Sequence, residues 1–280
     1  MKRKLELDHS KKGGTNLTQI IHDLADANLI ESIREHACWQ SPCELVEEGG
    51  VLMVAGATNF PGAYKNCVAR VDPGVAAREV VARAQEFFGY RNRGFTVFVR
   101  ASRDEDLENL MQEDGFIQRA DSPCMLIDAP VAVPELRAGL RVENFSDQRH
   151  IRDAAAVNAE AYLALGLPVA ETQAIFADTA RVAARGLTGR IVYRDEQPLA
   201  TALVIKSAGG AGVYWVGTAS QAQRMGLASV CTALVTNAAL AEGASVVTLQ
   251  ASPFGEPVYQ RLGYRTYDRL KWFRGGGRAG

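Results

Sequence analysis

Short runs rich in β-branched and aromatic residues, separated by glycine or polar turns, recur through the second half of the chain. Runs of this kind are typical of strands that bury at least one face. The polar turn at residues 194–197 joins two of them as a hairpin, and Gly209-Gly210 turns the chain again. The pattern predicts six strands in this half, at residues 140–145, 190–193, 199–206, 212–217, 245–250 and 264–273.

Apolar residues at helical spacing predict four helices between these strands. The clearest begins near Gly226, where apolar residues from Leu227 to Ala238 recur at intervals of three or four. Gly243 stands where the C-cap of this helix is expected. Ser146 is the expected N-cap of an earlier one. The other three helices are predicted at residues 146–164, 169–183 and 256–262.

The first half of the chain ends in a similar order of elements. A helix at 76–88, a strand at 95–100 and a helix at 105–113 precede a strand that ends near residue 127. The segments LENLMQEDGF and EPVYQRLGY each contain a short helix, then a glycine with an aromatic residue, then a strand. This similarity indicates a degenerate internal repeat.

Two prolines separate the halves. Pro130 and Pro134 interrupt the periodicity and disfavour helix, which predicts a linker. The glycine-rich end of the chain is expected to be flexible, because glycine loses much entropy on ordering. We therefore divide the chain into an N-terminal domain (1–128), a linker (129–138), a C-terminal domain (139–273) and a tail (274–280).

Charge and composition exclude several classes of function. The 31 Lys and Arg residues nearly cancel the 32 Asp and Glu residues, so no global field attracts nucleic acid or an anionic membrane. No run of apolar residues reaches the ~18 that a membrane helix needs, and no signal peptide is evident. Five scattered cysteines argue for a reducing compartment. We expect a cytoplasmic protein, with no nucleic-acid partner and no membrane. His36, Cys38 and Cys43 lack a second ligand pair, so no metal is expected.

The segment from Val216 to Ser229 (VGTASQAQRMGLAS) carries the clearest chemical signal. A predicted strand ends there, a short loop follows, and a helix begins. The first N–H groups of a helix have no backbone acceptor and carry partial positive charge, so they suit a pyrophosphate. The small residues Gly226 and Ala228 let phosphate oxygens approach the backbone, and Arg224 adds a charge-assisted contact.

In this context the chain resembles the GNAT superfamily of N-acetyltransferases. The family signature is Arg or Gln, two residues, Gly, one residue, then Gly or Ala; Gln223, Gly226 and Ala228 match it. Gln replaces the commoner Arg at residue 223. The closing segment, residues 249–273, resembles the family in its strand, short helix with a tyrosine, glycine-aromatic pair and last strand. The resemblance covers roughly residues 140–273.

The resemblance implies a fold and a cofactor. The fold is α/β (α+β), a GNAT-like mixed and mostly antiparallel sheet flanked by helices, in two tandem lobes of which the first is degenerate. The co-substrate is acetyl-CoA, whose pantetheine arm would lie where the strands around Val216 and Leu249 splay apart. The residues implied at the cofactor are Val216, Thr218, Gln223, Arg224, Gly226, Leu227, Ala228, Ser229 and Ser252.

The resemblance also implies a catalytic tyrosine. Tyr259 stands four residues before Gly263, where the family often places it, and would protonate the thiolate leaving group. Residues 212–217 contain no acid, although some members have a glutamate base there, so the base stays unassigned. A structural role remains an open alternative for two of these residues. Tyr259 would then be an ordinary half-buried tyrosine, and Ser252 would cap a helix.

The acceptor is less defined. In this family the early helices supply substrate groups, which implies Glu160, Tyr162 and Asp178, although a solvated helix face would also explain charged residues there. We expect an N-acetyltransferase that acts on a primary amine of a small molecule or peptide. The alternatives are a protein that binds and senses acyl-CoA without turnover, and transfer of a longer acyl group.

The first half departs from the signature. Residues 71–76 do not match it, and Asp72 would repel a phosphate. We expect that this half does not bind the cofactor. It would instead shape the substrate cleft or carry the surface of a homodimer.

Overall fold

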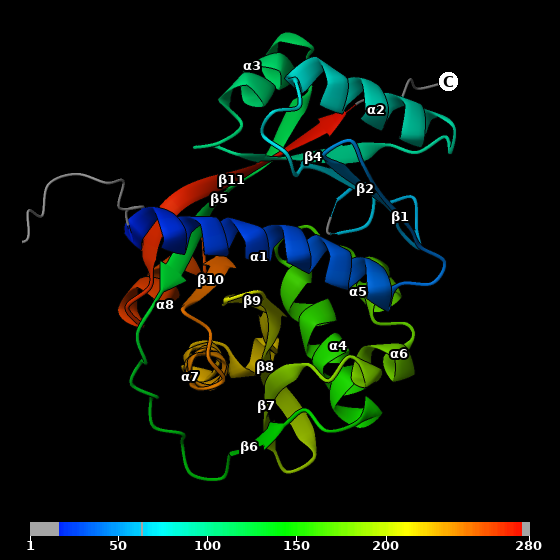
Figure 1. The fold of residues 1–280 in the computed structure, drawn as a ribbon. Coiled ribbons are helices and arrows are strands. Elements are labelled where there is room, and N and C mark those ends of the chain that lie inside the picture. The colour runs from blue at the N-terminus through cyan, green and yellow to red at the C-terminus, as the bar shows by residue number, and fades with distance from the viewer. Residues whose placement is uncertain (1–16, 63, 276–280) are drawn as a thin grey trace, which may run out of the picture.

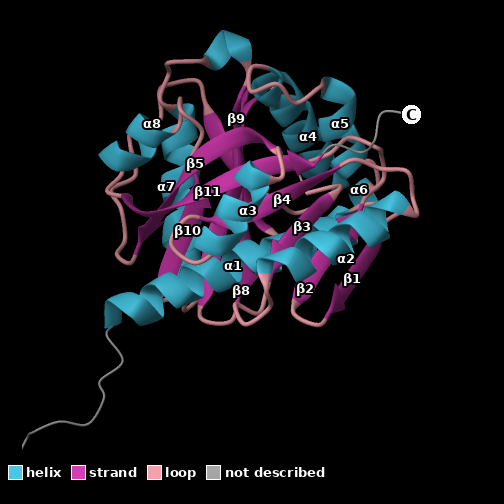
Figure 2. Cartoon of the chain, turned by 90° about the horizontal axis from the view of Figure 1, so that it is seen from above, coloured by secondary structure: helices cyan, strands magenta, loops and turns pink. Residues whose placement is uncertain are grey.

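A single continuous sheet organises the protein. The computed structural model describes residues 17–62 and 64–275. Within them, eleven strands follow the order β1-β2-β3-β4-β11-β5-β10-β9-β8-β7-β6 (Figures 1 and 2). Of these pairs, β3–β4 and β9–β10 are parallel and the others antiparallel. The predicted mixed, mostly antiparallel sheet flanked by helices is confirmed.

The second half of the chain follows the predicted order of elements. Asp178 starts a new helix by accepting a hydrogen bond from the Arg181 N–H, so the single helix predicted at 169–183 is two helices. The N-cap before residue 148 is Asp147, not Ser146. The last strand continues through the first two residues of the expected tail, and residues 276–280 lie outside the described residues. The elements are β6 (Arg141–Asn144), α4 (Gln148–Leu163), α5 (Val169–Ile175), α6 (Thr179–Ala184), β7 (Thr188–Arg194), β8 (Gln197–Ser207), β9 (Gly210–Thr218), α7 (Leu227–Ala241), β10 (Val246–Gln250), α8 (Glu256–Arg261) and β11 (Arg265–Gly275).

The first half contains the internal repeat that the sequence indicates. The series β7-β8-β9-α7-β10-α8-β11 repeats the series β1-β2-β3-α2-β4-α3-β5. In each series the third strand runs parallel to the fourth, with a helix between them. The elements are α1 (Leu17–Trp39), β1 (Glu44–Glu48), β2 (Val51–Ala55), β3 (Cys67–Arg70), α2 (Ala77–Gly89), β4 (Phe95–Arg100), α3 (Glu105–Glu113) and β5 (Ile117–Ile127).

The two halves exchange their last strands. β5 pairs with β10 of the second half, and β11 returns to pair with β4 of the first. The exchanged strands also pair with each other, which joins the two halves into one sheet. Residues 128–140 then form neither helix nor strand, and they reach β6 at the outer edge of the sheet (Figure 1). The domain boundary at residues 129–138 stays a prediction.

Helices cover both faces of the sheet in the second half. Ala202 and Val204 of β8 pack in one cluster with α7, whereas Leu203 and Ile205 pack in another with α4. Because side chains alternate along a strand, α7 and α4 lie on opposite faces.

The first helix contacts both halves. α1 lies between the upper and lower lobes in Figure 1. Its residues Leu29 and Ile33 pack in a cluster with Leu52 of β2, and the Asn28 side chain donates a hydrogen bond to the Ile205 carbonyl of β8 at 2.9 Å. The N-terminal half therefore supplies a helix to the core of the C-terminal half.

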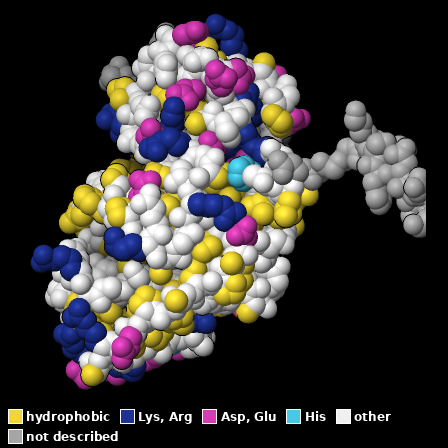
Figure 3. All heavy atoms as spheres, turned by 90° about the vertical axis from the view of Figure 1, so that its left-hand side faces the viewer, with side chains coloured by type: hydrophobic (Ala, Val, Ile, Leu, Met, Phe, Trp, Pro, Cys, Tyr) yellow, Lys and Arg dark blue, Asp and Glu magenta, His cyan; other side chains and the backbone are white. Residues whose placement is uncertain are grey.

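The surface carries mixed charge. On the face in Figure 3, basic and acidic side chains are interspersed, and a waist separates the two lobes. No helix within residues 17–62 and 64–275 is long and apolar enough to cross a lipid bilayer.

Candidate functional site

Strands β9 and β10 separate in the middle of the C-terminal half. Their parallel ladder ends at the pair Gly212–Thr248, although both strands continue beyond it. Past that point β9 pairs with β8 alone and β10 with β5 alone. The facing edges keep backbone N–H and C=O groups without a strand partner, which a ligand can satisfy. The gap expected between the strands around Val216 and Leu249 lies here.

A bulge at Trp215 bends β9 at this gap. Trp215 has φ of +52°, which is rare for a bulky side chain. The register of the β8–β9 ladder shifts between Tyr214 and Gly217. A bulge can place consecutive residues on one face. Tyr214 and Trp215 pack in the same cluster, while Val216 packs in the cluster on the opposite face.

After the bulge, two backbone N–H groups face the gap. Ala219 donates its N–H to the Leu199 carbonyl of β8 at 2.8 Å. Because N–H directions alternate along a strand, those of Thr218 and Val216 point to the other edge, towards β10. These are the two strand residues for which the sequence predicts a cofactor contact.

The loop after β9 leads into an uncapped helix start. Gly226 is the N-cap of α7, with φ of +80° and no side-chain capping bond. Within the described part of the chain, the N–H groups of Leu227, Ala228 and Ser229 have no hydrogen-bond acceptor. A β-carbon on Gly226 would have no atom within 4 Å, so the space before the helix is open. Such a start is suited to an anion.

Two exposed side chains accompany this helix start. Gln223 and Arg224 lie in the loop between the short 3₁₀ turn Ser220–Ala222 and α7. Arg224 also adopts a left-handed conformation, with φ of +62°. Their exposure lets either side chain reach an anion bound at the helix start.

Helix α4 contacts the same strand and loop. The Glu160 carboxylate accepts a hydrogen bond from the Ser220 N–H at 2.9 Å, so it orders the loop. The Tyr162 ring packs on Trp215 with a centroid distance of 5.0 Å. Burial raises the pKa of Tyr162, with a further contribution from Tyr259, while the Val216 backbone opposes the shift. Tyr162 of α4 therefore adjoins both Trp215 and Val216 of β9.

Asn158 was missed by the sequence analysis. Its side chain is fully buried, and neither its oxygen nor its nitrogen has a hydrogen-bond partner. It lies against Gly217, directly beyond the bulge. The available signal was its place in the apolar stretch AAAVNAEAYL, four residues before Tyr162 on the same helix face.

Tyr259 lies in the core cluster that joins β10 and α7. It is buried with Leu249 and Leu227, and its ring packs tightly over Gly255. Burial raises the pKa of Tyr259 above the usual value for a phenol. Among residues 17–62 and 64–275 its hydroxyl has no hydrogen-bond partner. The hydroxyl is therefore protonated at neutral pH and available to a ligand.

Two of the expected site residues have local structural contacts. The Ser252 hydroxyl accepts the Gly255 N–H at 3.1 Å in the turn before α8, but the N-cap of α8 is Gly255, so Ser252 is not the cap of this helix. Asp178 binds the Arg181 backbone and side chain at the start of α6. None of its contacts with other described residues reaches β9 or α7.

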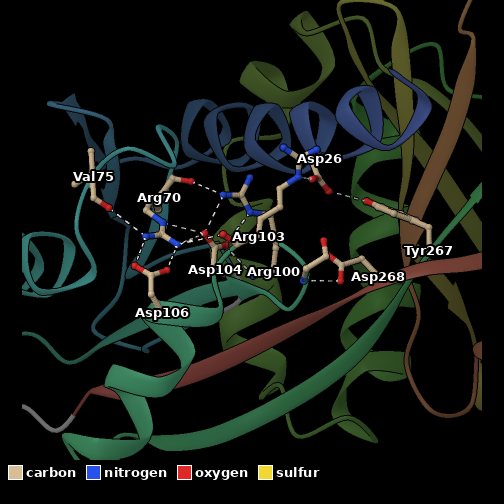
Figure 4. Close-up of polar contacts among 10 residues, drawn as sticks. Asp26, Arg70, Val75, Arg100, Arg103, Asp104, Asp106, Tyr267 and Asp268 are labelled. Atoms are coloured by element: carbon tan, nitrogen blue, oxygen red, sulfur yellow. Dashed lines mark hydrogen bonds and ion pairs between the residues drawn. The ribbon is translucent and has the colours of Figure 1, made fainter. Parts of the chain in front are cut away.

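The equivalent place in the N-terminal half is filled by an ion-pair cluster. The β3–β4 ladder ends at Ala69–Phe98, and beyond it Arg70 and Arg100 converge on Asp104 (Figure 4). Asp104 is fully buried, and its oxygens lie 2.9 Å from a nitrogen of each guanidinium. The protein's own charged groups thus occupy the gap that β9 and β10 leave open.

In this half α2 also begins without a side-chain cap, but a carboxylate precedes it, and the tyrosine has no counterpart. The Asp72 carboxylate accepts the Gly74 N–H at 2.8 Å, before α2 begins. A carboxylate there disfavours a phosphate, and the absence of a cofactor site from this half stays a prediction. Met111 stands four residues before Gly115, the position that Tyr259 has relative to Gly263.

The fold is that of known acetyltransferases. No protein-family model and no curated protein sequence matches this chain. A solved GCN5-related N-acetyltransferase from Kribbella flavida is similar over 90% of this chain and 97% of its own, with a TM-score of 0.68 and 22% identity. A GCN5-related N-acetyltransferase from Sphaerobacter thermophilus is similar over 91% and 93%, with a TM-score of 0.62 and 18% identity.

A third similar structure has the same tandem arrangement. It is a tandem GNAT protein from the clavulanic acid biosynthesis pathway, similar over 91% of this chain and 96% of its own, with a TM-score of 0.61 and 14% identity. The recognition of the GNAT fold from the sequence is confirmed, and it extends over both halves of the chain.

Proposed function

We propose that this protein is an acetyl-CoA-dependent N-acetyltransferase with one cofactor site, in its C-terminal half. The observation that carries the proposal is the gap between β9 and β10, which begins at Gly212–Thr248 and leads to the uncapped start of α7. The edge of β9 beyond the ladder, which has no strand partner, suits a ligand with an amide-containing arm, and the free N–H groups at the start of α7 suit a pyrophosphate.

The residues present fit acetyl-CoA. The N–H groups of Val216 and Thr218 would bind the pantetheine arm, in the manner of an added strand. The N–H groups of Leu227, Ala228 and Ser229, with Gln223 and Arg224, would hold the pyrophosphate. When bound, acetyl-CoA supplies a thioester that an amine can attack.

Tyr259 is proposed as the proton donor. Its raised pKa keeps the phenol protonated, and it would give this proton to the departing sulfur. A further backbone N–H of the separated strand would donate to the acetyl oxygen as negative charge develops there. The attacking amine must be neutral, so water would remove its proton.

The acceptor is proposed to be a primary amine of a small molecule or a peptide. It would approach from the α4 face, where Tyr162 and Asn158 adjoin the bulge of β9. Glu160 would act indirectly through the loop that it orders. A cytoplasmic location is part of this proposal.

Calorimetric titration with acetyl-CoA tests the cofactor site. We expect binding of one acetyl-CoA per chain, which Gly226→Glu should abolish by placing an acid before the helix start. The matched control is Gly115→Glu in the N-terminal half. Gly115 has φ of +73° and equally open surroundings, so the backbone strain is the same. Equal loss of affinity in both variants, or no binding to the wild type, would contradict the proposal.

The second candidate is a protein that binds acyl-CoA and senses it without turnover. It is favoured by one observation, the lack of any acidic residue in β9. Assay of the wild type against a panel of amines separates the two candidates. Turnover that falls in Tyr259→Phe at unchanged acetyl-CoA affinity supports the enzyme. Binding without turnover on any amine supports the sensor.

A further inference from the structure

A buried histidine of the N-terminal half is hydrogen-bonded to the bulge of β9. His36 of α1 is fully buried, and its Nε2 lies 2.7 Å from the indole nitrogen of Trp215. Its Nδ1 lies 2.5 Å from the Ser32 carbonyl. The indole N–H can only donate and the carbonyl can only accept. His36 must therefore be neutral, with its proton on Nδ1, and both ring nitrogens are engaged.

The residue that His36 holds has a strained backbone. Trp215 is the left-handed bulge residue, and a non-glycine residue in that conformation persists only when its surroundings enforce it. The indole ring is also flanked by Tyr162 and Phe176, each at a centroid distance of 5.0 Å. The hydrogen bond to His36 is the one polar contact of this side chain within the described residues.

His36 is itself fixed from several sides. The Tyr64 ring stacks on the imidazole at 3.9 Å with an interplanar angle of 6°. On the same helix, Glu35 binds Arg185 at the end of α6 at 2.6 Å. Lys65, next to Tyr64, forms an ion pair with Glu171 of α5. The imidazole is therefore part of a rigid contact between the two halves.

We propose that His36 is a positioning residue for acetyl-CoA. By holding Trp215 in its left-handed conformation, it keeps the N–H groups of Val216 and Thr218 turned towards β10. The N-terminal half, whose own gap is filled, thereby contributes to the cofactor site of the other half. The role of His36 in acetyl-CoA binding rests on the proposed function. Its role in holding the bulge at Trp215 does not.

The test compares two substitutions of His36. His36→Leu removes the acceptor for the indole N–H, whereas His36→Gln retains one near the position of Nε2. A lost hydrogen bond corresponds to about tenfold in an equilibrium constant. We expect about tenfold weaker acetyl-CoA binding in His36→Leu, and near wild-type binding in His36→Gln. Trp215→Phe breaks the same bond from the other side, retains an aromatic ring, and should behave like His36→Leu.

Hydrogen exchange of residues 214–218 in the cofactor-free protein gives an independent readout. Exchange there should accelerate about tenfold in His36→Leu. The control is Leu29→Ala, which removes packing from the same face of α1 away from Trp215. It should lower the melting temperature without a selective change in this segment.

The outcomes are distinct. Unchanged exchange and unchanged affinity in both His36→Leu and Trp215→Phe would overturn the inference. Equal effects of Leu29→Ala at matched stability would also overturn it, because the role of His36 would then be general packing. If the wild type does not bind acetyl-CoA, the proposed function fails, while the exchange experiment still decides whether His36 positions the bulge.

Discussion

The carboxamide oxygen of Asn158 lies so close to Gly217 that a β-carbon on the glycine would stand 2.4 Å from it. Asn158 belongs to α4 and Gly217 to β9, just beyond the bulge. Because Asn158 is fully buried, its side chain has little room to move aside. Helix α4 is thus pressed against the strand that carries the proposed cofactor contacts, and the two should respond together to mutation.

Gly217→Ala should be destabilising and should weaken acetyl-CoA binding. Overpacking of a buried site costs roughly 1–3 kcal/mol, and the displaced strand would carry Val216 and Thr218 with it. Chemical denaturation and calorimetric titration measure the two effects.

Asn158→Ala should remove that conflict. Alone, it deletes two unsatisfied polar atoms as well as some packing, so we expect a change in unfolding free energy within about 1 kcal/mol. Combined with Gly217→Ala, it should restore most of the lost stability. Simple additivity of the two single effects would contradict a direct contact.

Tyr259→Phe should lower kcat about a hundredfold or more, as expected for loss of a general acid, and leave the dissociation constant for acetyl-CoA unchanged. Because burial raises the pKa of Tyr259, the wild-type rate should not decline as the pH approaches the ordinary phenol value of 10.0. The control is Tyr264→Phe, whose hydroxyl pairs with Thr236 at 2.6 Å. It should affect stability rather than kcat, and an equal fall in kcat would argue against a specific role for Tyr259.

The positions of helices and strands could be predicted from the sequence better than the pairing of the strands. Strand and helix patterns depend on neighbouring residues, so most elements of the second half and the uncapped start at Gly226 followed from the sequence. The exchange of β5 and β11 did not, because pairing between residues as distant as Ile127 and Val247 leaves no local pattern.

The side-chain contacts around the candidate site could not be predicted from the sequence either. The contact between His36 and Trp215 joins residues 179 positions apart. Asp178 was predicted to be a substrate group because a charged residue in a predicted helix can either bind a ligand or cap a helix. The sequence alone does not distinguish these two roles. The capping role of Asp178 depends on where α6 begins.

Stability should fall on acidification through His36. Burial lowers the pKa of His36 from 6.5 to about 4 in the folded state. The unfolded chain therefore binds a proton that the folded protein excludes, and stability present above pH 6.5 is lost as the pH falls towards 4. The full effect is about 3 kcal/mol.

Denaturation of wild type and His36→Gln over this pH range measures the contribution. The other groups that face this imidazole are the same in both proteins. They are Glu35 with its partner Arg185, and the phenols of Tyr64 and Tyr214. The difference between the two curves therefore isolates His36. Parallel curves would contradict a buried neutral histidine.

Asp104→Asn should be strongly destabilising without creating a second cofactor site. It removes the charge that pairs two buried guanidinium groups, Arg70 and Arg100, and breaking a buried pair costs about 3–5 kcal/mol. Asp106→Asn is the matched control, because Asp106 binds the same Arg70 but is largely exposed. Calorimetry should still give one acetyl-CoA per folded chain, and a stoichiometry of two would contradict a blocked N-terminal site.

The exchanged strands have a consequence for biosynthesis. During translation, β4 leaves the ribosome long before its partner β11 has been synthesised. In the same way, β5 emerges before its partner β10. Each growing half therefore exposes a sheet edge until the other has emerged, so folding cannot be completed one half at a time. A chaperone that shields strand edges would assist this protein at the stage when α2 and α3 are already synthesised and β11 is not.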